Sequence, residues 1–182
     1  IGHRVVHGGE TFSGSVLIAQ DGAVFLSKGY GLADRAQGIP NTPQTRFHRG
    51  SMTKTFTAMG ILILESQGKL SLQDPICNFV AGCPTAWQGV TIHHLLTNTS
   101  GLSRMLSSKL YGVIDRGTTD LVTSPVSPVE QADYLGLTRE WPVGARPGER
   151  YIYNNFGYIL LTHIIQEVSG QSYADFLEQT IF

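Results

Sequence analysis

The two apolar runs of SVLIAQDGAVFLSKGYG, joined by Asp21-Gly22, constrain the fold more than any other local feature. Asp-Gly between such runs is typical of a β-hairpin, because both residues of its two-residue turn need positive φ. We therefore predict strands over residues 14–19 and 23–31. A two-stranded hairpin is marginally stable on its own, so this one must pack on helices or pair with strands that come from elsewhere.

No further clear strand follows the hairpin, and the rest of the chain is predicted to be mostly helical. GLADRAQGIPNTPQT is rich in Gly, Pro and Asn and predicts a loop. An amphipathic helix then begins at Ser51 and is stopped by Gly68, with apolar residues close to a period of 3.6. We expect its apolar face to contain Met52, Phe56, Met59, Ile63 and Leu64, with Ile61 and Leu62 widening it.

Four more helices are expected further along the chain. The first is short, capped by Thr91 and ended before Gly101. Residues 103–127 predict a loop-rich insertion, and SPVEQADYLG predicts a second short helix. After a loop in REWPVGARPGERYIY, a strong helix in NNFGYILLTHIIQEVSG ends at Gly170, and a last one begins at Ser172.

Composition bounds the size and class of the protein. The 182 residues, 41% of them hydrophobic, suit one globular domain with a sizeable core. The net charge of -1 leaves no basic stripe, which argues against nucleic acid as a partner. No apolar run approaches the roughly 20 residues that a membrane-spanning helix needs.

Cys77 and Cys83 lie close together in DPICNFVAGCPTAW. They are either two buried thiols, which behave as small apolar groups, or a short-loop disulfide, which would indicate an oxidising compartment. A zinc site would need more ligands at this spacing. We favour the disulfide, and with it an extracytoplasmic location, periplasmic or secreted.

Ser51 and Lys54 raise the main functional question. Three residues apart on a helix, their side chains share one face. Ser51 is then either a helix cap beside a solvated lysine, or a nucleophile in the first turn, where the helix dipole favours a developing alkoxide. A partly desolvated lysine can take the hydroxyl proton. This is the Ser–Lys form of acyl-enzyme chemistry.

A second copy of the Ser-x-x-Lys spacing serves as a control. Ser66 and Lys69 lie at the C-terminal end of the same helix, with Gly68 between them. The dipole there disfavours an alkoxide, so we interpret this copy as a helix exit.

Tyr153-Asn154-Asn155 precedes a predicted helix and adds a second motif. A tyrosine can carry a proton if a neighbouring ammonium lowers its pKa. An asparagine can orient a substrate carbonyl or hold the lysine. The alternative is a buried aromatic residue followed by an asparagine N-cap.

Other catalytic motifs are missing from the sequence. It contains no Gly-x-Ser-x-Gly elbow, and Gly170-Gln171-Ser172 comes near that pattern only between two helices. It contains no His-Glu-x-x-His, and the adjacent His93 and His94 fall on different helix faces. We therefore expect no metal and no cofactor.

Three blocks of the sequence resemble the serine β-lactamase-related family of class C β-lactamases, DD-peptidases and related esterases. They are GSMTKTFTAMGILILESQGKLSLQDPI, VTIHHLLTNTSGL and PGERYIYNNFGYILLTHIIQEVSGQSYADFLEQTIF, in the family's order and over nearly the whole chain. The resemblance implies an α/β (α+β), β-lactamase/transpeptidase-like fold. It also implies that Ser51 is the acylated nucleophile, Lys54 its partner, Tyr153 the acid/base and Asn155 a substrate contact.

Two departures from the family pattern stand out. Asn98 takes the place of the usual His in a His-Thr-Ser-Gly block, at a position that the family uses structurally, so the change is expected to matter little. The family's third motif, Lys-Thr-Gly or His-x-Gly on a later strand, is absent after Tyr153. We therefore expect residues 1–182 to be an incomplete domain, with a hairpin and loop over 1–50 and a mostly helical region over 51–182. A C-terminal segment or a second chain would supply the missing sheet strands.

The sequence thus predicts a penicillin-binding or β-lactamase-like serine hydrolase. It would act on amide, β-lactam or ester carbonyls of a small-molecule or peptide substrate. Two alternatives stay open: a carboxylesterase of the same family, and a non-catalytic protein that binds peptides or cell-wall fragments on this scaffold.

Overall fold

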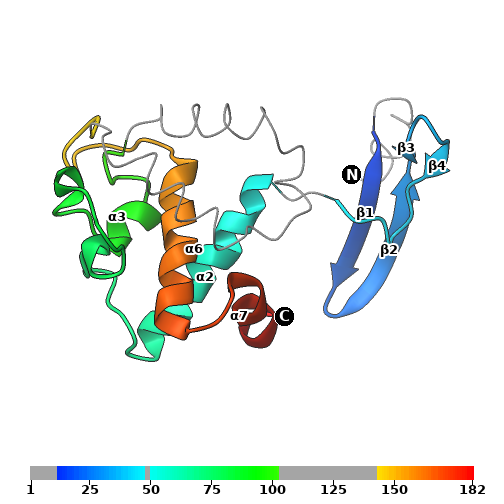
Figure 1. Cartoon of the computed structure of the whole chain (residues 1–182). Coiled ribbons are helices and arrows are strands. Elements are labelled where there is room, and N and C mark those ends of the chain that lie inside the picture. Colours follow the sequence, from blue (N-terminus) through cyan, green and yellow to red (C-terminus); the bar gives the residue numbers. More distant parts are fainter. Residues whose placement is uncertain (1–11, 48–49, 103–142) are drawn as a thin grey trace. The chain divides into compact units, whose positions relative to one another are not determined.

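The computed structural model describes residues 12–47, 50–102 and 143–182 (Figure 1). The predicted insertion over 103–127 and the helix in SPVEQADYLG lie outside these residues. Internal contacts divide the chain into two units, Ile1–His48 and Arg49–Phe182, and each is described by itself.

The N-terminal unit is built on the predicted hairpin. Strand β1 (Gly14–Gln20) pairs antiparallel with β2 (Ala23–Tyr30), which confirms both predicted strands to within a residue. Asp21 and Gly22 form the turn with φ of 51° and 79°, the positive values that this turn requires.

The predicted loop after the hairpin contains two strands that the sequence analysis missed. Strand β3 (Leu32–Asp34) pairs antiparallel with β4 (Ile39–Pro40). The Asp34 carboxylate accepts a hydrogen bond from the Gln37 backbone N–H at 3.0 Å and closes the turn between them. Strands of three and two residues are too short to leave a periodic apolar pattern, so composition alone predicted a loop.

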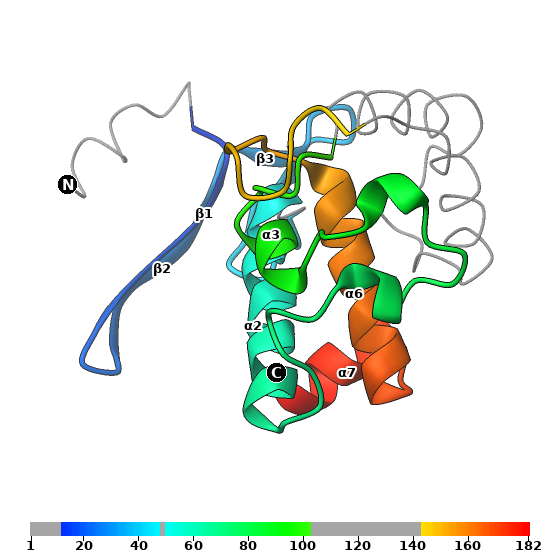
Figure 2. The ribbon, with the colours of Figure 1, turned by 90° about the vertical axis from the view of Figure 1, so that its left-hand side faces the viewer.

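Four α-helices are described in the second unit, together with three short 3-10 turns. The helices are α2 (Thr53–Ser66), α3 (Ile92–Leu96), α6 (Asn155–Ser169) and α7 (Tyr173–Thr180), and the turns are η1 (Gly50–Met52), η2 (Ile76–Asn78) and η3 (Thr85–Trp87). Helices α2 and α6 lie side by side, α3 packs on α6 and α7 packs across both α2 and α6 (Figures 1 and 2). Within the described ranges, each helix is too short or too polar to cross a bilayer.

The predicted helix ends are confirmed by their caps. The Thr91 hydroxyl accepts from the His94 N–H, and the His94 ring accepts in return from the Thr91 N–H, which forms a capping box for α3. Gly170 ends α6 with a φ of 69°, and Ser172 caps α7.

The buried face of α2 agrees with the predicted one at Ile61 and Leu64 but differs at other positions. Thr57, Gly60, Ile61 and Leu64 are buried, whereas the predicted face residues Met52 and Met59 are 66% and 51% exposed. Gly60 explains why the buried face differs from the predicted one, because a Cβ there would lie only 3.1 Å from Ile165 of α6 and Phe176 of α7. A helix packs closest where its side chains are small, and a count of large apolar residues misses such a face.

Cys77 and Cys83 are joined by a disulfide, as predicted, with Cα atoms 5.2 Å apart. Cys77 lies in η2 and Cys83 lies between η2 and η3, and both pack against the hydrophobic core of the helical unit. The fully buried members of this core include Ile61, Trp87, Ile92, Phe156 and Leu161.

Candidate active site

Ser51 lies in the 3-10 turn η1 that precedes α2. This corrects the prediction that Ser51 belongs to the first turn of the α-helix, since α2 begins only at Thr53 and its N-cap is Met52. Gly50 starts the turn with a φ of 51°, a conformation that glycine adopts without steric cost. The N-cap makes no side-chain cap bond, so the interpretation of Ser51 as a simple helix cap is wrong.

The Ser51 hydroxyl meets two groups from distant parts of the chain. Its Oγ lies 2.7 Å from the Tyr153 hydroxyl, across a sequence separation of 102 residues. Lys54 Nζ donates a longer hydrogen bond to the same Oγ at 3.4 Å. The three predicted catalytic side chains therefore converge within hydrogen-bond reach, as a nucleophile and its proton acceptor must.

Asn155 holds the lysine. Lys54 Nζ donates to Asn155 Oδ1 at 2.6 Å, a short bond that orients the amine. Of the two roles considered for this asparagine, a substrate contact and a support for the lysine, the geometry displays the second. The N-cap of α6 is the preceding residue, Asn154, whose side chain accepts from the Phe156 N–H.

Two aromatic rings flank the lysine. Lys54 Nζ lies 5.0 Å from the ring centroid of Tyr153 and 5.4 Å from that of Tyr158, within the range of a cation–π contact. The Tyr158 hydroxyl donates to the Leu96 carbonyl at 2.9 Å and ties α6 to α3. Sequence reasoning missed Tyr158, although its position three residues after Asn155 on a helix places both on one face.

The pKa values of the two tyrosines at the site are shifted in opposite directions. Burial raises the pKa of Tyr153, but polar contacts with Lys54 and Ser51 and the lysine charge outweigh it, so this pKa lies below its ordinary value. Burial raises the pKa of Tyr158, and the neighbouring Tyr153 and Tyr151 raise it further. Groups whose pKa values are driven apart in this way divide the roles of proton carrier and neutral support.

The control copy of the Ser-x-x-Lys motif has none of this geometry. Ser66 is the last residue of α2, and its hydroxyl donates back to the Ile63 carbonyl of the same helix at 2.8 Å. Gly68 takes a φ of 69° before Lys69, so the chain has left the helix. The prediction that this copy is a helix exit is confirmed.

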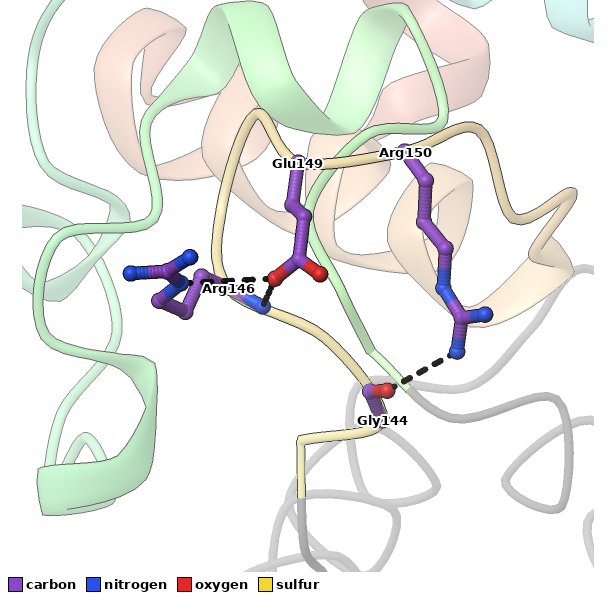
Figure 3. A network of polar contacts seen from close by, with 4 residues as sticks. All are labelled: Gly144, Arg146, Glu149 and Arg150. Atoms are coloured by element: carbon purple, nitrogen blue, oxygen red, sulfur yellow. Dashed lines mark hydrogen bonds and ion pairs between the residues drawn. The ribbon is translucent and has the colours of Figure 1, made fainter.

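The loop that leads to Tyr153 is braced by its own polar contacts (Figure 3). Glu149 accepts from the Arg146 backbone N–H at 3.0 Å and from Arg146 Nε at 3.4 Å, and the bond from the backbone is the main cause of the lowered Glu149 pKa. Arg150 donates to the Gly144 carbonyl at 3.0 Å. An open hollow of about 460 Å³ runs along this loop, but Ser51, Lys54 and Tyr153 do not line it.

Among the described residues, no group of three or more His, Cys, Asp or Glu side chains is placed to hold a metal ion. Within the same ranges, the polar groups at the site are hydroxyls, an amine and an amide.

Residues 3–182 match the family described as Beta-lactamase. The chain belongs to the Beta-lactamase family. Its relatives include penicillin-binding protein 4* of Bacillus subtilis, which is 34% identical over 179 residues. The teichoic acid D-alanine hydrolase of Staphylococcus aureus is 30% identical over 164 residues. These alignments cover 94% and 90% of this chain, but only 36% and 37% of the relatives.

Solved structures show the same relationship. The octameric penicillin-binding protein homologue from Pyrococcus abyssi matches with a TM-score of 0.77 at 35% identity, over 99% of this chain and 41% of that one. The fold is thus that of the β-lactamase/transpeptidase group, as predicted, and this member of the Beta-lactamase family spans less than half the length of these relatives. The family includes hydrolases such as the D-alanine hydrolase named above.

Proposed function

We propose that this Beta-lactamase family member is a serine hydrolase that forms an acyl-enzyme on Ser51. One observation carries the proposal: Ser51 Oγ lies 2.7 Å from a tyrosine hydroxyl whose pKa is lowered by an adjacent lysine. A serine hydroxyl becomes a useful nucleophile when a neighbouring base can take its proton. The short contact with Ser51 supports Tyr153 as this base, and the lowered pKa of Tyr153 supports Lys54 as the group that stabilises its phenolate.

The reaction would proceed in two half-reactions. The Tyr153 phenolate accepts the Ser51 proton while Oγ bonds to the substrate carbonyl carbon, and the carbonyl π electrons move to its oxygen. The tetrahedral intermediate collapses, the bond to the leaving group breaks, and Tyr153 returns the proton to that group. Water then adds to the acyl-serine with the same proton transfers and releases the acid and Ser51.

Lys54 and Asn155 would act by charge and position. The Lys54 ammonium, held at 2.6 Å by Asn155 Oδ1, provides the nearby positive charge that favours the phenolate form of Tyr153. The proximity of Ser51 to the N-terminal end of α2 adds the positive end of a helix dipole.

The substrate class is an acyl donor with an amide, β-lactam or ester carbonyl. Support comes from the relatives named as a penicillin-binding protein and a teichoic acid D-alanine hydrolase. Their names, together with the Cys77–Cys83 disulfide, support a cell-wall-related acyl group met outside the cytoplasm.

Covalent labelling tests the proposal directly. A fluorophosphonate or a penicillin should add its mass to the peptide that contains Ser51, as read by tandem mass spectrometry, and Ser51→Ala should abolish the label. Ser66→Ala is the matched control, because it removes the serine of the second Ser-x-x-Lys copy and should leave labelling unchanged. A label on Ser66, or one that survives in Ser51→Ala, would contradict the mechanism.

A further inference from the structure

Asn98 has an unusual backbone conformation just beyond α3. Its φ is 55°, and Asn98 and Asp21 are the two residues other than glycine with positive φ in the described part of the chain. Asparagine tolerates this left-handed region better than most residues. Its own N–H donates to the Leu95 carbonyl at 3.2 Å, and the next residue, Thr99, donates to His94 at 2.9 Å. Helix α3 therefore fixes the orientation of Asn98.

Asn98 binds the residues on both sides of Tyr153. Its backbone carbonyl accepts from the Ile152 N–H at 2.7 Å, and its side-chain Oδ1 accepts from the Asn154 N–H at 3.0 Å. The first bond holds the peptide unit between Tyr151 and Ile152, and the second holds the one between Tyr153 and Asn154. Together they restrain the backbone on both sides of Tyr153 and so the direction in which its side chain leaves the backbone.

Asn154 makes this attachment rigid. It is 2% exposed, and its side chain donates to the Leu102 carbonyl at 2.9 Å and accepts from the Phe156 N–H at 2.8 Å. A backbone N–H in such a buried place needs its acceptor. The short Asn98 carboxamide supplies it from a left-handed backbone, a combination that glycine or alanine cannot offer.

We propose that Asn98 is a positioning residue for catalysis, whose side-chain Oδ1 and backbone carbonyl together set the Tyr153 hydroxyl against Ser51. The inference rests on the proposed function for its catalytic consequence, but the placement of Tyr153 can be measured without activity. It gives a role to a position at which the family resemblance implied that the change from His matters little.

Asn98→Gly is the informative variant, because glycine keeps the left-handed backbone and the carbonyl but has no side-chain acceptor. In the full chain it should slow fluorophosphonate labelling of Ser51 by about 10- to 100-fold, since misplacing a reacting group by about 1 Å can cost that much. The pKa of Tyr153, followed by NMR of carbon-13-labelled tyrosine, should rise as the phenol moves away from Lys54 and Ser51. Lys54 and Ser51, the groups that lower this pKa, are themselves unchanged in the variant.

Two further variants separate positioning from stability. Asn98→His restores an acceptor at the same distance from the backbone, and histidine also accepts the left-handed region; it should recover most of the rate. Below an imidazole pKa of about 6.5 that acceptor is lost, so this variant should show an extra fall in rate that the unmodified chain lacks. Asp21→Gly is the matched control, because it relaxes the other left-handed residue, in the β1–β2 turn, and should change neither rate nor pKa.

The outcomes are distinguishable. An unchanged Tyr153 pKa in folded Asn98→Gly would overturn the inference, even if the labelling rate fell with the folded fraction. If Asn98→Gly does not fold, the inference would instead be overturned by an Asn98→His variant whose rate shows no extra fall at acid pH. Failure of the unmodified chain to label at Ser51 would count against the proposed function alone, because the NMR titration still reports where Tyr153 lies.

Discussion

At the scale of single residues, the geometry of the site depends on which groups the Lys54 amine contacts. One amine contacts the Ser51 hydroxyl at 3.4 Å, the Asn155 side-chain oxygen Oδ1 at 2.6 Å and the faces of two tyrosine rings. The shorter bond goes to the amide, so Lys54 is held mainly as a fixed charge. Ser51 Oγ lies closer to the Tyr153 hydroxyl, at 2.7 Å, than to Lys54 Nζ.

The pH dependence of Ser51 acylation should therefore follow Tyr153. Its pKa in the folded chain lies below the ordinary value, so the phenolate fraction and the rate should rise with pH through that lowered pKa and fall on the acid side. Tyr153→Phe should remove this rise of the rate with pH and lower the rate by about 10²- to 10⁴-fold, the usual contribution of a general base. Tyr151→Phe is the matched control, two residues away and exposed, and a pH–rate profile of ester hydrolysis or probe labelling is the measurement. If Tyr153→Phe kept the full rate, the general base would be Lys54 and not Tyr153.

At the scale of elements, the site is held by the packing of α2 on α6. Ser51 comes from η1, Lys54 comes from the first turn of α2, and Asn155 and Tyr158 come from the first turns of α6. Further along, the two helices approach closely where Gly60 of α2 faces Ile165 of α6. A second tie is the 2.7 Å bond between the hydroxyls of Thr57 on α2 and Tyr173 on α7.

Two glycine-to-alanine changes test this packing. Alanine favours a helix over glycine by about 0.5–1 kcal/mol, but at Gly60 the new Cβ would lie 3.1 Å from the buried Ile165 and Phe176. Overpacking of about 1–3 kcal/mol should outweigh the gain, so Gly60→Ala should lower the free energy of unfolding by about 1 kcal/mol. At Gly157 of α6 the nearest atom, on Leu95, is at an ordinary 3.5 Å, and Gly157→Ala should stabilise. Urea denaturation measures both; a stabilising effect of Gly60→Ala would show that the close contact at Gly60 does not limit the packing.

At the scale of the whole molecule, the hairpin unit carries several exposed apolar side chains. Leu17 and Phe25 are 67% and 69% exposed, and the adjacent Ile18 is exposed as well. Neighbouring residues of a strand point to opposite faces, so both faces of the hairpin carry uncovered apolar side chains. Strands of this kind normally lie inside a sheet, and an uncovered strand pair is a template for association.

We expect the 182-residue chain to self-associate through this hairpin. Phe25→Lys should lower the association constant measured by analytical ultracentrifugation, because it removes apolar area and places a charge on an edge. Ser27→Lys is the matched control: it adds the same charge two residues further along the same strand without removing apolar surface, and its effect should be smaller. Equal effects of the two changes would assign the association to net charge, and a monomer at all concentrations would contradict the prediction.

Local sequence was sufficient to predict several features of this protein. Asp21-Gly22 determines the hairpin turn, Thr91, Gly170 and Ser172 determine helix ends, and the short spacing of Cys77 and Cys83 permits their bond. Each depends on interactions within a few residues, so each can be predicted from the sequence. The roles of Ser51, Lys54 and Tyr153 came instead from the order of motifs and a family resemblance.

Only the tertiary structure decided which face of α2 is buried and how the site is held together. Gly60 is buried because α6 and α7 approach it, and Tyr158 and Asn98 matter because they meet Lys54 and the neighbours of Tyr153. The bond between Ser51 and Tyr153 spans 102 residues. Contacts over such separations are set by how helices pack on a shared core, and no local propensity, period or spacing encodes them.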